Sequence, residues 1–148
     1  MIQALEIHAA PGNDDYQALW QRIIPALSDE STVWQADCLD CLYECALVEG
    51  RYTTDALLAA MKDNNFILSA RLMALPDCRP LNRPIFTAGD FYASNCESIV
   101  FCADLGFFDI FSKRPERLER LSQAFSDGLA RVEVFHDATL VGRTNFLA

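Results

Sequence analysis

Three closely spaced cysteines are the first residues whose type and spacing could do chemistry. Cys38, Cys41 and Cys45 form a CxxCxxxC pattern, and thiolates at such spacing can bind zinc or act as a redox pair. We expect them on one helix, where a rise of about 1.5 Å per residue separates the first and third by about 10 Å. Because the sulfur ligands of one zinc ion lie about 4 Å apart, a single helix cannot present all three. The pattern therefore favours buried core thiols, so we assign no metal site and keep a zinc or redox protein as the lower alternative.

An acidic stripe runs along the same expected helix. Asp37, Asp40 and Glu44 recur at positions i, i+3 and i+7, which places them on one helical face. A cluster of like charges costs stability through self-repulsion, so such a face indicates docking to a basic partner. The alternative is an ordinary solvent-exposed face.

The long segment 76–96 combines residue types that are common at binding surfaces. It contains three prolines, arginines and aromatic side chains, and long loops on a rigid scaffold often carry binding residues. We expect a short helix over Thr87–Ser94 and a loop that contacts a partner or lines a pocket against the sheet. A purely structural cover over the sheet is the other interpretation. The candidate binding residues here are Arg79, Arg83, Asp90 and Tyr92.

Sequence motifs of common catalytic sites are missing. The chain has two histidines and lacks GxGxxG, Walker, GxSxG, HExxH and EF-hand patterns. Cys-His-Asp sets can be drawn from Cys78, Cys96 or Cys102 with His136 and Asp137, but nothing in the sequence brings these residues together. We therefore expect no cofactor, and the sequence favours a role other than catalysis.

Length, composition and charge limit which class of protein the chain can belong to. The chain has 148 residues, 51% of them hydrophobic, and a net charge of −9, which predicts one globular α+β domain over residues 1–148. The negative charge argues against nucleic acid and anionic membranes as partners, and no apolar run approaches the roughly 20 residues of a membrane span. Six cysteines without an export signal indicate reduced thiols and a cytoplasmic location. Residues 1–74 carry eleven acidic and four basic side chains, so the N-terminal half is the more negative one.

The N-terminal half should contain three helices between two strands. Hydrophobic periodicity predicts a strand over Ile2–His8, a helix that begins near Asn13, a second helix over Val33–Glu49 and a third from Thr53 to about Asp63. Apolar residues at every second position of Phe66–Leu75 form one apolar face and predict a further strand.

The segment 97–135 predicts the clearest architecture. Two alternating runs around Gly106 form a hairpin, Pro115 begins a helix, and a strand follows Gly128. Because strand–helix–strand units usually pair in parallel through a right-handed crossover, we expect a mixed, mostly antiparallel sheet with N-terminal helices and a C-terminal β-hairpin–α–β unit. The aromatic run Phe107–Phe111 is either core or half of a homodimer interface, and Thr139–Arg143 should form a short last strand.

Together these features predict a small acidic cytoplasmic protein-binding module. Bacterial toxin-neutralising immunity proteins, other inhibitors and adaptors are often built this way, and the expected partner is another protein, of basic character. The alternative is a small-molecule-binding protein or an enzyme with a pocket between the 76–96 loop and the sheet.

Overall fold

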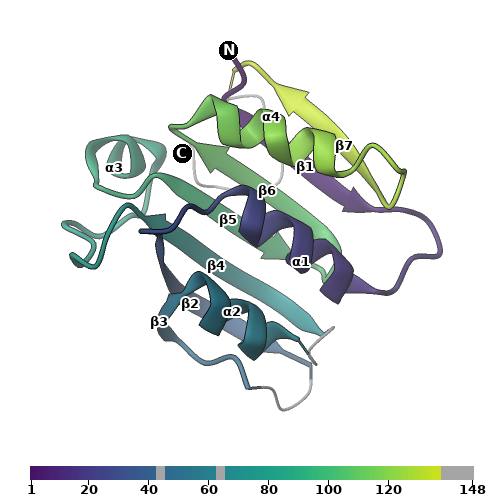
Figure 1. Ribbon diagram of the computed structural model, residues 1–148, viewed down its shortest axis with the longest axis horizontal. Helices are drawn as coiled ribbons and strands as arrows, with labels where there is room; N and C mark the ends of the chain where they lie inside the picture. Colours follow the sequence, from purple (N-terminus) through teal and green to yellow (C-terminus); the bar gives the residue numbers. More distant parts are fainter. Residues whose placement is uncertain (43–45, 63–65, 138–148) are drawn as a thin grey trace.

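A single antiparallel sheet organises the part of the chain that the structure describes. The computed structural model describes residues 1–42, 46–62 and 66–137 (Figure 1). These residues form a seven-stranded sheet in the order β3-β2-β4-β5-β6-β1-β7, with every neighbouring pair antiparallel. The strands are β1 (Ala4–Ala9), β2 (Val33–Cys41), β3 (Gly50–Thr53), β4 (Ile67–Leu75), β5 (Ser98–Ala103), β6 (Phe107–Ser112) and β7 (Ala130–Phe135). The helices are α1 (Tyr16–Ala26), α2 (Thr54–Met61), α3 (Ala88–Ala93) and α4 (Pro115–Ala124).

One face of the sheet, called here the helix face, is covered by α1, α2 and α4. Figure 1 shows these helices side by side across the sheet. The largest group of buried apolar side chains lies beneath them. Trp20 of α1 meets Phe108 of β6 edge-on with ring centroids 4.8 Å apart, and Leu118 and Leu121 bury the apolar stripe of α4. This face is the main hydrophobic core.

The opposite face, called here the loop face, is covered at one end by α3 and the loop before it. Phe91 of α3 packs in a smaller buried cluster with Met73, Ile99 and Phe111. Thr87 begins α3 with a capping box, in which its side chain accepts the amide of Asp90 and the Asp90 carboxylate accepts the amide of Thr87. The short helix expected within the long loop is confirmed.

The helix expected over Val33–Glu49 is wrong, because residues 33–41 form β2. Trp34 of β2 is buried in the core of the helix face. β2 pairs with β3 on one side and with β4 on the other. A β-bulge interrupts the pairing between Asp37 and Asp40, where Cys38 has a φ of 52°. The extra residue of a bulge breaks the two-residue period of a strand, so the acidic and cysteine spacings resemble a helix.

The C-terminal elements lie at the expected residues, but their pairing differs. β5 and β6 form the hairpin, and α4 and β7 follow. The predicted parallel pairing is wrong, because β1 lies between β6 and β7 and is antiparallel to both. The expectation of a mixed sheet is likewise wrong for the described strands. The α+β architecture is confirmed, and the strand predicted over Thr139–Arg143 lies outside the described residues.

The β5–β6 turn depends on a close approach to the N-terminal segment. Asp104 and Leu105 take positive φ values of 52° and 70°. A Cβ atom at Gly106 would lie 2.9 Å from the Cβ of Ala9 and 3.0 Å from the ring of Tyr16. Glycine is therefore required at this position because the turn packs against the end of β1 and the start of α1.

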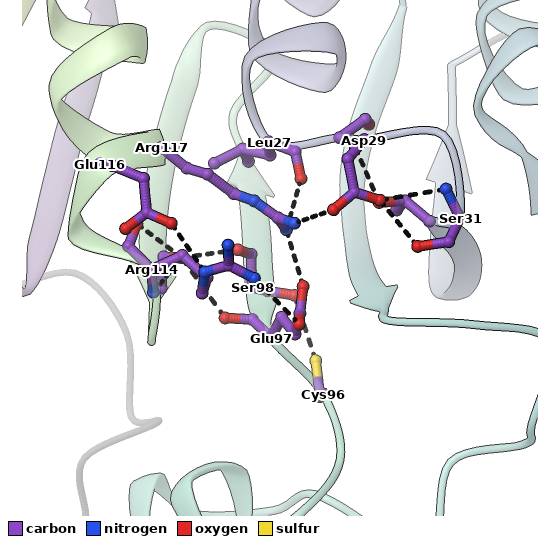
Figure 2. A network of polar contacts seen from close by, with 12 residues as sticks. Leu27, Asp29, Ser31, Cys96, Glu97, Ser98, Arg114, Glu116 and Arg117 are labelled. Atoms are coloured by element: carbon purple, nitrogen blue, oxygen red, sulfur yellow. Dashed lines mark hydrogen bonds and ion pairs between the residues drawn. The ribbon is translucent and has the colours of Figure 1, made fainter.

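A buried arginine joins α1, α4 and the start of β5 (Figure 2). Arg117 is 2% exposed and donates to the carbonyl of Leu27 at 3.0 Å and to Asp29 at 2.7 Å. Its guanidinium also lies 2.9 Å from a carboxylate oxygen of Glu97. Arg120 donates to the carbonyl of Ala26 at 2.7 Å, so the two arginines satisfy backbone acceptors that the end of α1 leaves without helical partners.

Candidate functional site

A pocket of about 510 Å³ opens between the loop face and the long loop. Strands β2 and β4 supply its floor, and residues 80–86 supply its wall. This is the place where the sequence suggested a ligand pocket between the 76–96 loop and the sheet. The lining residues are Gln35, Asp37, Arg71, Pro80, Leu81, Asn82, Arg83, Pro84, Ile85 and Phe86.

An ion pair on the floor of the pocket fastens the loop to the sheet. Arg71 and Asp37 are register partners on β4 and β2, and the guanidinium donates from Nε at 2.7 Å and from Nη2 at 2.5 Å to the two carboxylate oxygens. The hydrogen bonds that Arg71 donates to Asp37 raise the pKa of Arg71. The remaining nitrogen, Nη1, donates to the carbonyl of Ile85. Asp37 is therefore neutralised within the molecule and does not form part of a free acidic face.

A second carboxylate holds the rim of the pocket in one conformation. Asp90 accepts the amides of Phe86 and Thr87, each at 3.0 Å, and the guanidinium of Arg83 at 2.9 Å. These bonds, led by that from the Phe86 amide, lower the pKa of Asp90. Asn82 and Asn95 exchange amide–side-chain bonds at 3.0 and 3.2 Å. Hydrogen bonds thus hold the loop both at Asn82 and around Asp90.

Phe86 projects from this fixed loop into solvent. Its side chain is 78% exposed, and it borders both the pocket and a second hollow of about 590 Å³ that Asp90 and Ala93 also line. Proline and arginine neighbours complete the area. We call it the Phe86 surface and define it as Asn82, Arg83, Pro84, Phe86 and Asp90.

The other predicted site residues lie apart from this surface or contribute little to it. Arg79 is exposed and pairs with Asp77 at 2.8 Å. Asp40 is exposed on β2 beyond the bulge. Tyr92 is 48% exposed on α3, where partial burial raises its pKa. Glu44 lies outside the described residues, so of the seven candidates the structure brings together Asp37, Arg83 and Asp90.

The cysteines are dispersed over the described part of the chain. Cys38 is exposed in the bulge, Cys41 is half-buried and Cys78 is exposed, while Cys45 lies outside the described residues. Burial raises the pKa of the Cys38 thiol, and the neighbouring Asp37 carboxylate raises it further. Among the residues that the structure describes, no group of three or more histidine, cysteine or acidic side chains is arranged to hold a metal ion.

The two buried cysteines are unsuited to act as nucleophiles. Cys102 packs in the core of the helix face and Cys96 in the cluster of the loop face. Burial raises the pKa of Cys96 to about 12 and that of Cys102 further still. Both thiols therefore stay protonated at neutral pH, and the thiolate is the nucleophilic form.

Sequence reasoning missed a row of acidic side chains on the loop face. Asp109 of β6, Glu6 of β1 and Glu133 of β7 lie opposite one another across three adjacent strands. Glu6 is 8% and Asp109 6% exposed, and His8 Nε2 lies 2.7 Å from Glu6. The available signal was a polar residue at alternate positions of otherwise apolar strands. The row makes the end of the loop face away from α3 polar.

Comparison with known proteins found no similar protein. No protein-family model, curated protein or solved structure matches the chain. In residues 1–42, 46–62 and 66–137, none of the helices has the length and apolar composition needed to cross a membrane. The function must therefore be argued from the geometry of the loop face.

Proposed function

We propose that this chain is a protein-binding module that contacts its partner through the Phe86 surface. The observation that carries the proposal is the 78% exposure of Phe86 on a loop whose conformation is fixed by Asp90. When a partner covers a large aromatic side chain that was exposed to water, the free energy falls, which favours binding. Aromatic and arginine side chains are also the commonest anchors of protein interfaces, and Arg83 lies beside Phe86 on this surface.

The rigidity of the loop supports binding rather than a passive cover. The cluster around Phe91 already closes the end of the loop face, so Phe86 is not needed to bury the sheet. A loop that is ordered before binding loses little conformational entropy when it meets a partner. The two hollows beside Phe86 offer space for side chains of that partner.

Surface charge supports a basic partner. Within the described residues, the arginines of the loop and the helix face donate to carboxylates or backbone carbonyls of the same molecule. The chain has a net charge of −9, and several exposed acids have no ion pair with another described residue, so they present negative charge to solvent. A toxin-neutralising protein, another inhibitor or an adaptor that binds a basic protein fits this arrangement. The acids concerned are Glu30, Asp40, Glu49, Asp55 and Glu119.

The test compares proteins captured by two variants of the full chain. A variant carrying Phe86→Ser and Arg83→Ala should lose a partner that the wild type retains, because it removes the aromatic anchor and the guanidinium beside it. The matched control is Val48→Ser, which changes an apolar residue that is 61% exposed away from this surface. The captured protein is then titrated by calorimetry, and its affinity should fall as salt rises. Equal capture by wild type and double variant would contradict the proposal.

A second candidate is a small-molecule-binding protein that uses the pocket. Its volume of about 510 Å³ lies within the roughly 300–1,000 Å³ typical of ligand sites. Arg83 and Gln35 on its lining suit a ligand with a carboxylate or phosphate group. Native mass spectrometry of freshly purified protein tests this candidate, since a bound mass that Arg83→Ala loses would favour it over the protein-binding module.

A further inference from the structure

Among the described strands, β7 forms one edge of the sheet, and neither proline nor a bulge interrupts it. It is outermost in the order of described strands, and its six residues read ARVEVF. Natural edge strands are commonly shortened or carry proline, charged side chains or a bulge, which discourage pairing with another chain. The opposite edge, β3, has only four residues. β7 is longer and has neither proline nor a bulge, and its two charged side chains, Arg131 and Glu133, have opposite signs.

Hydrogen bonds next to β7 determine which of its backbone groups point outward. The amide of Ala10 donates to the carbonyl of Leu129 at 3.2 Å, while that of Ala9 donates to Gly106 on the side of β6. Hydrogen-bonded pairs alternate along an antiparallel ladder, so in the β1–β7 register Arg131 and Glu133 bond to β1. The amides and carbonyls of residues 130, 132 and 134 therefore point away from the sheet.

Two opposite charges lie two residues apart along this edge. Arg131 and Glu133 are exposed and share the loop face with their cross-strand neighbours His8 and Glu6. Glu133 thus lies opposite another acid, Glu6, and like charges directly opposite on adjacent strands repel each other. Among the described residues no cation forms an ion pair with Glu133, and the guanidinium of Arg131 reaches only His8, at 3.5 Å.

We propose that β7 pairs antiparallel with β7 of a second copy of this chain, around a two-fold axis at Val132. In this register Arg131 of each copy lies opposite Glu133 of the other, and the outward backbone groups of residues 130, 132 and 134 meet those of the partner. A shift by two residues in either direction would place Glu133 opposite Glu133, or Arg131 opposite Arg131. Charge complementarity therefore selects both the occupant, a second copy, and its register.

Apolar contacts favour the same arrangement. Val132 and Val134 lie on the helix face, opposite Ile7 and Leu5 of β1, and Val134 is 39% exposed. In the proposed register Val132 meets its own counterpart, and Val134 lies beside Ala130 of the second copy. The two sheets would then continue as one.

Sedimentation velocity of the full chain over a concentration series tests the dimer. Wild type should change from monomer to dimer as concentration rises. Arg131→Glu and Glu133→Arg should each weaken association roughly tenfold or more, because each replaces two attractive pairs with two repulsive ones. The double variant carrying both changes should restore it, and a mixture of the two single variants should form a heterodimer.

The controls separate this interface from folding and from the proposed function. A restored double variant, or a heterodimer of two monomeric single variants, requires folded chains. The Phe86→Ser and Arg83→Ala variant should still dimerise, because the Phe86 surface lies over β2 and β4 at a distance of several strands from β7. A wild type that remains monomeric, or a dimer that both single variants form as well as wild type, would overturn the proposal.

Discussion

The two faces of the sheet are built on different principles. Beneath α1, α2 and α4 the helix face is an apolar core that includes Trp20, Phe108 and Leu118. The loop face has a smaller apolar cluster at one end and ionisable residues elsewhere, among them Arg71 and Glu6. Burial of apolar area is the main source of folding free energy. Stability therefore resides mainly on the helix face, whereas the residues proposed for recognition lie on the loop face.

The largest expected difference in the free energy of unfolding comes from replacing one phenylalanine on each face by alanine. Phe108→Ala should destabilise the protein by about 3–5 kcal/mol, because it leaves a cavity beneath Trp20. Phe86→Ala should change the free energy of unfolding by less than about 0.5 kcal/mol, since that side chain is 78% exposed. Urea denaturation measures both. Phe108→Leu serves as the milder core variant if Phe108→Ala fails to fold, and a costly Phe86→Ala would contradict the division between the faces.

The next largest effect tests the polar contact that fastens α4. Arg117→Met should cost about 3 kcal/mol, because it leaves Asp29, Glu97 and the Leu27 carbonyl without their shared donor. The cost stays near the lower end of the range for buried pairs, since the Asp29 side chain is 50% exposed. Arg120→Met is the matched control, because that residue is exposed. A loss no greater than that of the control would show that water replaces the network.

A smaller effect compares helix caps on the two faces. Thr87→Ala removes the cap of α3 on the loop face, and Thr53→Ala removes the cap of α2 on the helix face. Each should cost about 1 kcal/mol of unfolding free energy. Hydrogen exchange should separate them, because Thr87→Ala should also speed exchange of the Phe86 amide, which Asp90 holds. Equal protection of that amide in both variants would mean that the loop does not depend on its cap.

The smallest effect is a pH-dependent ion pair on the outside of the helix face. Arg22 donates to Asp127 at 2.8 and 2.9 Å, and this bond lowers the pKa of Asp127 to about 2. Because the folded pKa lies below the unfolded value of about 3.9, the pair contributes stability above about pH 4 and loses it as pH falls towards 2. Melting curves of wild type and Asp127→Asn should therefore approach each other as pH falls and converge below about pH 2. A difference that persists there would assign the effect to another contact.

The sequence predicted those elements whose periodicity is local. β4, α2, the β5–β6 hairpin and α4 each keep an apolar pattern that can be read within the element itself, because each has a row of apolar residues that packs in the core of the helix face. β2 was missed since its bulge at Cys38 shifts the pattern. The insertion of β1 between β6 and β7 was also missed, because such pairing depends on residues far apart in the chain.

The candidate site could be predicted only in part for the same reason. The loop that carries Arg83 and Asp90 was visible from its composition and length. The pairing of Asp37 with Arg71 joins residues on different strands and leaves no local signal. The buried cluster of the loop face contains Phe91 and leaves Phe86 exposed. Which of these two nearby aromatic side chains is buried depends on the tertiary structure.

The position of β1 has a consequence for how the chain matures during synthesis. Among the described strands, the first one made pairs only with β6 and β7, whose residues follow about 100 positions later. Leu5 and Ile7, which are fully buried in the finished sheet, therefore have no strand partner while most of the chain is being translated. Pairing between distant segments is slow because it closes long loops. The sheet is thus completed only after β7 has left the ribosome, and a growing chain must keep its apolar first strand from pairing with other chains until then.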